Sequence, residues 1–170
     1  MSGAYTNDRA WSDQFIPRIK RIVGPLLLEP APLEEDCAHA TDLIVLNARD
    51  RRIACRMRRV GFALRFPNDF TVRSQRDNGA ETELSKMVNG FGDWFFYGHA
   101  ASKDGIEISR WMIVDLSAWR SHRIRNPQRC RPKIMPNGDG THFAVFNLDQ
   151  FNGKPDILIA VGCDAESEAA

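Results

Sequence analysis

The sequence predicts an α+β (mixed α/β) domain, with a central, mostly antiparallel or mixed sheet that helices flank. The chain has 170 residues, of which 43% are hydrophobic and 26% are charged, and this size and composition are typical of one globular domain. Few segments show a helical period, whereas several short segments are β-branched or alternate between apolar and polar residues. We therefore expect a single domain over residues 1–163 and a frayed acidic tail over 164–170.

The helical pattern runs from residue 11 to residue 28, with Pro17 tolerated in the first turn and Gly24-Pro25 expected to kink or end the helix. Two strand-like segments follow at 41–46 and 52–59, and a short polar turn separates them. A turn of that length predicts an antiparallel hairpin.

The rest of the chain is richer in strands than in helices. We expect strands at 69–74, 93–97, 108–116, 142–148 and 157–161, helices at 80–89 and 117–122, the second capped by Ser117, and a basic loop at 120–133. Residues 106–163 are expected to extend the same sheet.

Neither a membrane segment nor a disulfide framework is expected. The apolar runs are far shorter than the ~20 residues that span a bilayer. The four cysteines are scattered, without a close pair, which favours free thiols and a cytoplasmic location.

Asp42 opens the first strand of the expected hairpin, and Arg56 and Arg58 lie two residues apart on the second strand. With the element order over residues 11–98, this arrangement resembles the core of the PD-(D/E)XK nuclease superfamily, to which many restriction endonucleases belong. In that superfamily an acid and a lysine at this spacing converge on a metal ion beside the phosphate. The chain also resembles small phage proteins. The resemblance implies a restriction-endonuclease-like core over 11–98, DNA as the partner, and allows a homodimer.

Arginine neither ligates a metal nor acts as a base at neutral pH, so the resemblance leaves two hypotheses. In an active nuclease, Asp36 and Asp42 would hold Mg²⁺, and catalysis would use Asp42, Glu83, Lys86 and Arg58. In an inactive scaffold, no cofactor is needed, and the protein would bind or inhibit a host protein or a nucleoprotein complex. Glu83 and Lys86 lie three residues apart on a helix, so a solvated ion pair would also explain them.

Arginine-rich segments give the clearest functional indication. The net charge is only +1, yet no acid lies between Arg51 and Arg65, and segregated charge of this kind produces basic surfaces that attract phosphate. The candidate nucleic-acid-binding residues are Arg51, Arg52, Arg56, Arg59, Arg73, Arg76, Arg123 and Arg125. An acidic protein partner would fit the same surface, and ordinary surface arginines are the alternative.

An aromatic run at 94–97 is typical of a core strand, although its rings could also stack on bases. Tyr97 and His99 follow at the end of this run. They could lie close to the site, or they could be structural.

Overall fold

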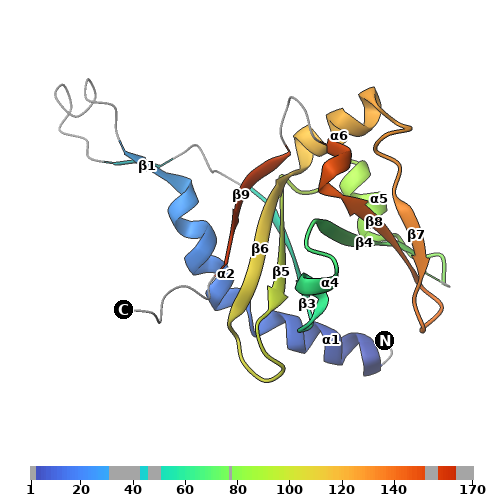
Figure 1. The fold of residues 1–170 in the computed structure, drawn as a ribbon, viewed down its shortest axis with the longest axis horizontal. Coiled ribbons are helices and arrows are strands. Elements are labelled where there is room, and N and C mark those ends of the chain that lie inside the picture. The colour runs from blue at the N-terminus through green and yellow to red at the C-terminus, as the bar shows by residue number, and fades with distance from the viewer. Residues whose placement is uncertain (1–2, 31–42, 46–50, 77, 152–156, 164–170) are drawn as a thin grey trace. The chain divides into compact units, whose positions relative to one another are not determined.

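The computed structural model describes residues 3–30, 43–45, 51–76, 78–151 and 157–163, and it confirms the α+β class (Figure 1). The chain divides into two compact units, Met1–Arg51 and Arg52–Ala170. The predicted tail at 164–170 lies outside the described residues.

The first unit contains helices and a small sheet. Helices α1 (Gly3–Asp13) and α2 (Ile16–Val23) precede a 3₁₀ turn η1 (Gly24–Leu27), and strand β1 (Leu28–Pro30) pairs antiparallel with β2 (Leu43–Val45). The prediction of one continuous helix from residue 11 is therefore wrong, whereas the expected end at Gly24-Pro25 is confirmed, because α2 stops at Val23. Pro17 lies in the first turn of α2, where its missing N–H removes no hydrogen bond, so α2 begins separately after α1 has ended.

The predicted hairpin between 41–46 and 52–59 is also wrong. Strand β2 pairs with β1, whereas β3 (Ile53–Arg58) pairs in parallel with β5 (Trp94–Ala100). A parallel pair cannot be joined by a tight turn and needs a long crossover. The segment between β3 and β5, which contains a strand and two helices, provides that crossover. The register places Arg56 opposite Tyr97 and Arg58 opposite His99.

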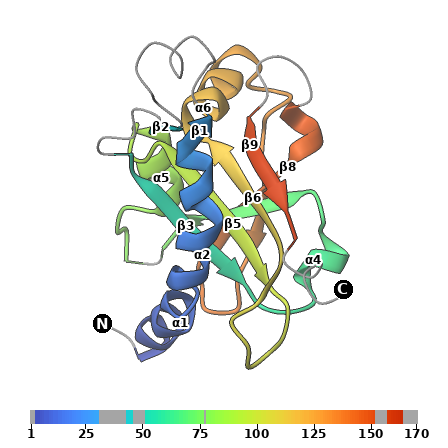
Figure 2. The same ribbon diagram turned by 90° about the vertical axis from the view of Figure 1, so that its left-hand side faces the viewer.

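The second unit contains two sheets. The first has the strand order β3-β5-β6-β9, with β6 at Ile108–Asp115 and β9 at Leu158–Gly162 (Figure 2). The second is antiparallel, with the order β4-β8-β7, and comprises β4 (Asp69–Gln75), β8 (His142–Asn147) and β7 (Lys133–Pro136). Residues 106–163 thus extend the first sheet only through β6 and β9. Strand β7 starts at the last residue of the segment predicted as a basic loop and was not expected.

Short helices and turns connect the strands of the second unit: α4 (Phe62–Arg65), α5 (Glu83–Val88), α6 (Leu116–Arg125) and η2 (Leu148–Phe151). Thr82 caps α5 by accepting a hydrogen bond from the Ser85 N–H. The prediction that Ser117 caps the next helix is wrong, because the Asp115 carboxylate accepts hydrogen bonds from the N–H groups of Ser117 and Ala118. That cap lets α6 begin one residue earlier than predicted.

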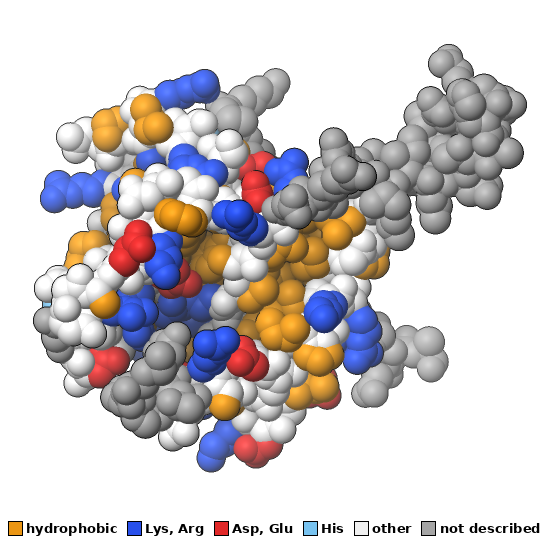
Figure 3. Space-filling model, turned by 180° about the vertical axis from the view of Figure 1, so that it is seen from behind, with side chains coloured by type: hydrophobic (Ala, Val, Ile, Leu, Met, Phe, Trp, Pro, Cys, Tyr) orange, Lys and Arg blue, Asp and Glu red, His pale blue; other side chains and the backbone are white. Residues whose placement is uncertain are grey.

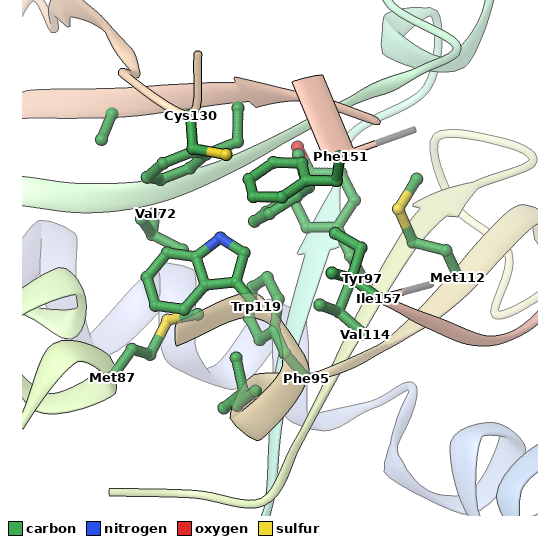
Figure 4. Close-up of a cluster of buried hydrophobic side chains, with 14 residues drawn as sticks. Val72, Met87, Phe95, Tyr97, Met112, Val114, Trp119, Cys130, Phe151 and Ile157 are labelled. Atoms are coloured by element: carbon green, nitrogen blue, oxygen red, sulfur yellow. The ribbon is translucent and has the colours of Figure 1, made fainter. Parts of the chain in front are cut away.

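Aromatic side chains fill the space between the two sheets (Figure 4). Phe70 of β4 stacks on Phe146 of β8, and Trp119 of α6 meets Phe146 edge to face. Phe95 and Tyr97 of β5 contribute from the other sheet. The core interpretation of the aromatic run is therefore confirmed for Phe95, Phe96 and Tyr97, which are all buried.

Two other expectations can be compared with the described residues. Among them, no helix has both the length and the apolar character needed to cross a membrane. Cys55, Cys130 and Cys163 are free thiols, as predicted, whereas Cys37 lies outside the described residues.

We predict that Phe146→Ala lowers the free energy of unfolding by about 3–5 kcal/mol, because it opens a cavity beside Phe70 and Trp119. Urea denaturation followed by tryptophan fluorescence measures this loss. The matched control is Phe91→Ala, which removes an exposed ring and should change stability by no more than about 0.5 kcal/mol. Equal losses in the two variants would contradict the described core.

Candidate functional site

Three guanidinium groups gather around the ring of Phe143 on β8. The Cζ atoms of Arg56, Arg58 and Arg73 lie 4.9, 5.6 and 5.9 Å from the centre of that ring. We call Arg56, Arg58 and Arg73 the arginine cluster. It joins the two sheets, because Arg56 and Arg58 come from β3 while Arg73 and Phe143 are register partners on β4 and β8.

Strand alternation explains why two of these arginines act together. Residues two apart on a strand face the same side, so Arg56 and Arg58 share a side of β3 with Ala54, which packs against the core. The arginine cluster thus continues the core layer along β3, where Arg56 and Arg58 follow the apolar Ala54 on the same side of the strand.

Glu83 is the carboxylate that the structure brings to this cluster. Its Oε2 atom lies 2.5 Å from Arg56 Nη1 and accepts a hydrogen bond of 3.0 Å from the backbone N–H of Arg73. One carboxylate therefore ties α5 to both β3 and β4. The predicted catalytic residue Lys86 is exposed on α5. The alternative of a solvated Glu83–Lys86 pair is wrong, because Glu83 forms its ion pair with Arg56 instead.

Arg58 is a partly buried cation of the cluster. Its Cζ atom lies 4.3 Å from the centre of the Phe62 ring, and its Nε atom is buried with no hydrogen-bond partner among the described residues. Burial lowers the pKa of Arg58, and the neighbouring Arg56 lowers it further, while Tyr97 raises it. An anion beside Arg58 would offset both the free-energy cost of burying its charge and the repulsion from Arg56.

Tyr97 and His99 lie on β5 beside the arginines. The Tyr97 hydroxyl is 3.1 Å from Thr71 Oγ1, and burial raises the pKa of Tyr97. His99 is only 1% exposed, and its Nδ1 atom has no partner among the described residues. Burial, followed by the charges of Arg58 and Arg110, lowers the pKa of His99 to about 4, so the imidazole is neutral at pH 7.

The molecular surface is hollowed over the half that carries β4, α5, β7 and β8 (Figure 1 and Figure 3). Figure 3, seen from behind, shows Lys and Arg side chains gathered in a recess over the half that carries β4, α5, β7 and β8 in Figure 1. A few acidic side chains lie at its border. One acid near the cluster is Asp139, in the turn between β7 and β8. Hydrogen bonds from Thr141 lower its pKa, with a smaller contribution from the charge of Arg73.

The other predicted arginines do not join the cluster. Arg51, Arg52 and Arg59 are exposed near the two ends of β3, and the backbone N–H of Arg52 donates to Asp93. Arg123 lies against the rings of Trp119 and Phe146, and Arg125 is exposed in the last turn of α6. Arg123 and Arg125 both lie in the last turn of α6, where their charges complement the negative end of the helix dipole.

Arg76 is partly buried, and its Nε atom has no partner among the described residues. It follows the last residue of β4, three positions beyond Arg73, and it does not lie over Phe143 as the three cluster arginines do.

The predicted magnesium ligands Asp36 and Asp42 lie outside the described residues. Within the described ranges, no group of three metal-ligating side chains occurs. Glu83 does not fit Mg²⁺ as it stands, because its Oε2 atom already accepts from the Arg56 guanidinium and from the backbone N–H of Arg73. These surroundings suit an anion.

The sequence analysis missed Phe143, Thr71 and Phe62. A phenylalanine in an alternating strand gives no sign that it will carry guanidinium groups, since that role depends on the β4–β8 register. Phe62 was detectable in principle, because it lies in the acid-free segment between Arg59 and Arg65.

Comparisons with known proteins give no assignment: no protein-family model, no curated protein and no solved structure matches this chain. Its fold and site thus define an α+β protein with an arginine cluster between two sheets.

We predict that His99 makes stability depend on pH. Since the pKa of His99 is lower in the folded state than the unfolded value of 6.5, the unfolded chain binds more protons between these pH values. Stability is therefore full above about pH 6.5 and falls by up to about 3 kcal/mol as pH drops toward 4. Urea denaturation at several pH values tests this. His99→Gln should flatten the dependence, and an unchanged pH profile in that variant would contradict the assignment.

Proposed function

We propose that this protein binds nucleic acid and holds its phosphate groups at the arginine cluster. The observation that carries the proposal is the convergence of Arg56, Arg58 and Arg73 on one ring, with one carboxylate, Glu83, bonded among them. The cluster keeps a net positive charge even when the nearby Asp139 is counted.

Such a cluster is costly unless an anion completes it. Three like charges repel one another, and burial removes the water that would screen them. The ring of Phe143 and the carboxylate of Glu83 compensate part of this. Arg58 still has a buried Nε atom without a partner among the described residues, and a guanidinium fork of this kind binds phosphate oxygens in pairs.

A polymer of phosphates fits better than a single small anion. Arg51, Arg52 and Arg59 extend the positive charge as exposed residues near the ends of β3, and the segment that carries them contains no acid. Spaced cations on one stretch of chain match the repeating charge of a nucleic-acid backbone. Nucleic acid as the partner also agrees with the cytoplasmic location expected from the sequence.

Hydrolysis by the nuclease mechanism is a separate hypothesis. It requires Asp36 and Asp42, which lie outside the described residues, together with Mg²⁺. Binding at the arginine cluster requires neither aspartate, and it holds for an active nuclease and for an inactive scaffold.

We predict that Arg58→Gln and Arg73→Gln each weaken oligonucleotide binding by about tenfold and lower the steepness of its salt dependence by about one unit. Fluorescence anisotropy with a labelled DNA or RNA oligonucleotide, measured between about 50 and 200 mM salt, gives both quantities. Arg9→Gln is the charge-matched control, because Arg9 pairs with Asp13 on α1, outside the cluster, and it should behave as wild type.

Two outcomes would contradict the proposal. One is the absence of oligonucleotide binding at low salt together with tight binding of an acidic polypeptide such as polyglutamate. The other is equal weakening by Arg9→Gln and Arg58→Gln, which would indicate unspecific attraction to charge.

A further inference from the structure

Two exposed phenylalanines adjoin the arginine cluster. Phe62 opens the short helix α4 and Phe66 follows its last residue, so they lie one turn apart, and the Phe66 N–H donates to the Phe62 carbonyl. Their ring centres are 6.4 Å apart. The two residues are 36% and 44% exposed, so part of each ring is open to a ligand.

Arg58 connects these rings to the cluster. Its Cζ atom lies 4.3 Å from the centre of Phe62 and 5.6 Å from the centre of Phe143. One guanidinium therefore lies near both the exposed ring of Phe62 and the cluster ring of Phe143. Arg65 lies 5.6 Å from the centre of Phe66 in the same way. The result is a surface on which two adjacent aromatic rings each have an arginine beside them.

The backbone fixes this surface close to β3. Gly61 separates β3 from α4 and adopts a φ of +88°, which a residue with a side chain rarely adopts. The chain thus turns within a few residues of Arg58, and Phe62 at the start of α4 contacts this arginine of β3. No acidic residue occurs between Arg51 and Asn68, so the electrostatics of this segment are entirely attractive to an anion.

We propose that Phe62 and Phe66 form a stacking platform for unpaired bases, so that the nucleic acid bound at the arginine cluster is single-stranded. This inference rests on the proposed function. Aromatic rings beside a basic groove are the usual means of holding a single strand, because every base has a face that can stack. In a duplex those faces are covered by neighbouring bases, so the exposed rings would gain nothing from it.

The spacing of the groups matches the two parts of a nucleotide. A phosphate held by Arg58 leaves its sugar and base within reach of Phe62, because the two side chains are in contact. A membrane surface is the other class of ligand that exposed phenyl and arginine side chains suggest. A membrane fits less well, because Arg58 is partly buried and the broad surface of a bilayer would not reach its guanidinium group.

Binding of a single-stranded oligonucleotide and of its duplex of equal length, compared by fluorescence anisotropy, tests the inference. The wild type should bind the single strand at least tenfold more tightly. Phe66→Leu keeps an apolar side chain but removes the ring, and it should weaken single-strand binding by about tenfold while leaving duplex binding unchanged. This variant is the cleaner one, because Arg58 lies over the ring of Phe62, whereas the ring of Phe66 has Arg65 beside it.

Leu64→Ala is the matched control, since Leu64 is apolar, 90% exposed and on the same helix, but has no ring. It should bind both oligonucleotides as wild type does. Equal affinity for single strand and duplex, or an unchanged affinity in Phe66→Leu, would overturn the stacking platform and leave the proposed function standing. Loss of oligonucleotide binding by Arg58→Gln but not by Phe66→Leu, together with sedimentation of the wild type on vesicles containing phosphatidylserine, would also overturn it. No binding of either oligonucleotide by the wild type would overturn the proposed function itself.

Discussion

The contact of Glu83 with Arg56 and with the backbone at Arg73 is the interaction on which the site depends. A carboxylate on α5 connects two strands that belong to different sheets. It balances one cation, and it fixes the distance between β3 and β4 at the end of the aromatic core. The remaining guanidinium groups then share the faces of Phe143 and Phe62. The cations held in this way carry more charge than the nearby described carboxylates neutralise, and the proposed anion binding rests on this excess.

Local patterns predicted most of the elements of the second unit. The alternation of apolar and polar residues placed β3 and β4 to within a few residues, the aromatic run gave β5, and strands were also predicted where β6 and β8 lie. Pairing was harder to predict. A polar turn between two apolar segments indicated a hairpin at 41–59, yet β3 pairs in parallel with β5, because the partner of a strand is decided by the packing of distant segments. Strand β7 was missed for a related reason, since all its residues are exposed and it has no buried face to produce a pattern.

The sequence predicted the charged residues of the site but not their arrangement in space. Arg56 and Arg58 were recognisable as a pair from their spacing of two, and Glu83 from its place on a helix. That Glu83 would meet Arg56 follows only from the crossover between β3 and β5. The role of Phe143 depends on its register with Arg73, and that of Phe62 on the turn at Gly61. Aromatic and basic residues therefore reach one recess through tertiary contacts that no short stretch of sequence records.

The most direct test of this account is the response of individual arginines to a bound oligonucleotide. The Nε–Hε signals of Arg58 and Arg73 can be followed by nitrogen–proton NMR and assigned with Arg58→Lys and Arg73→Lys variants. On titration with a single-stranded oligonucleotide, these two signals should shift together and saturate at the same concentration, while the signal of Arg9 stays in place. Unchanged signals of Arg58 and Arg73, with shifts confined to the arginines of α6, would show that the nucleic acid binds elsewhere.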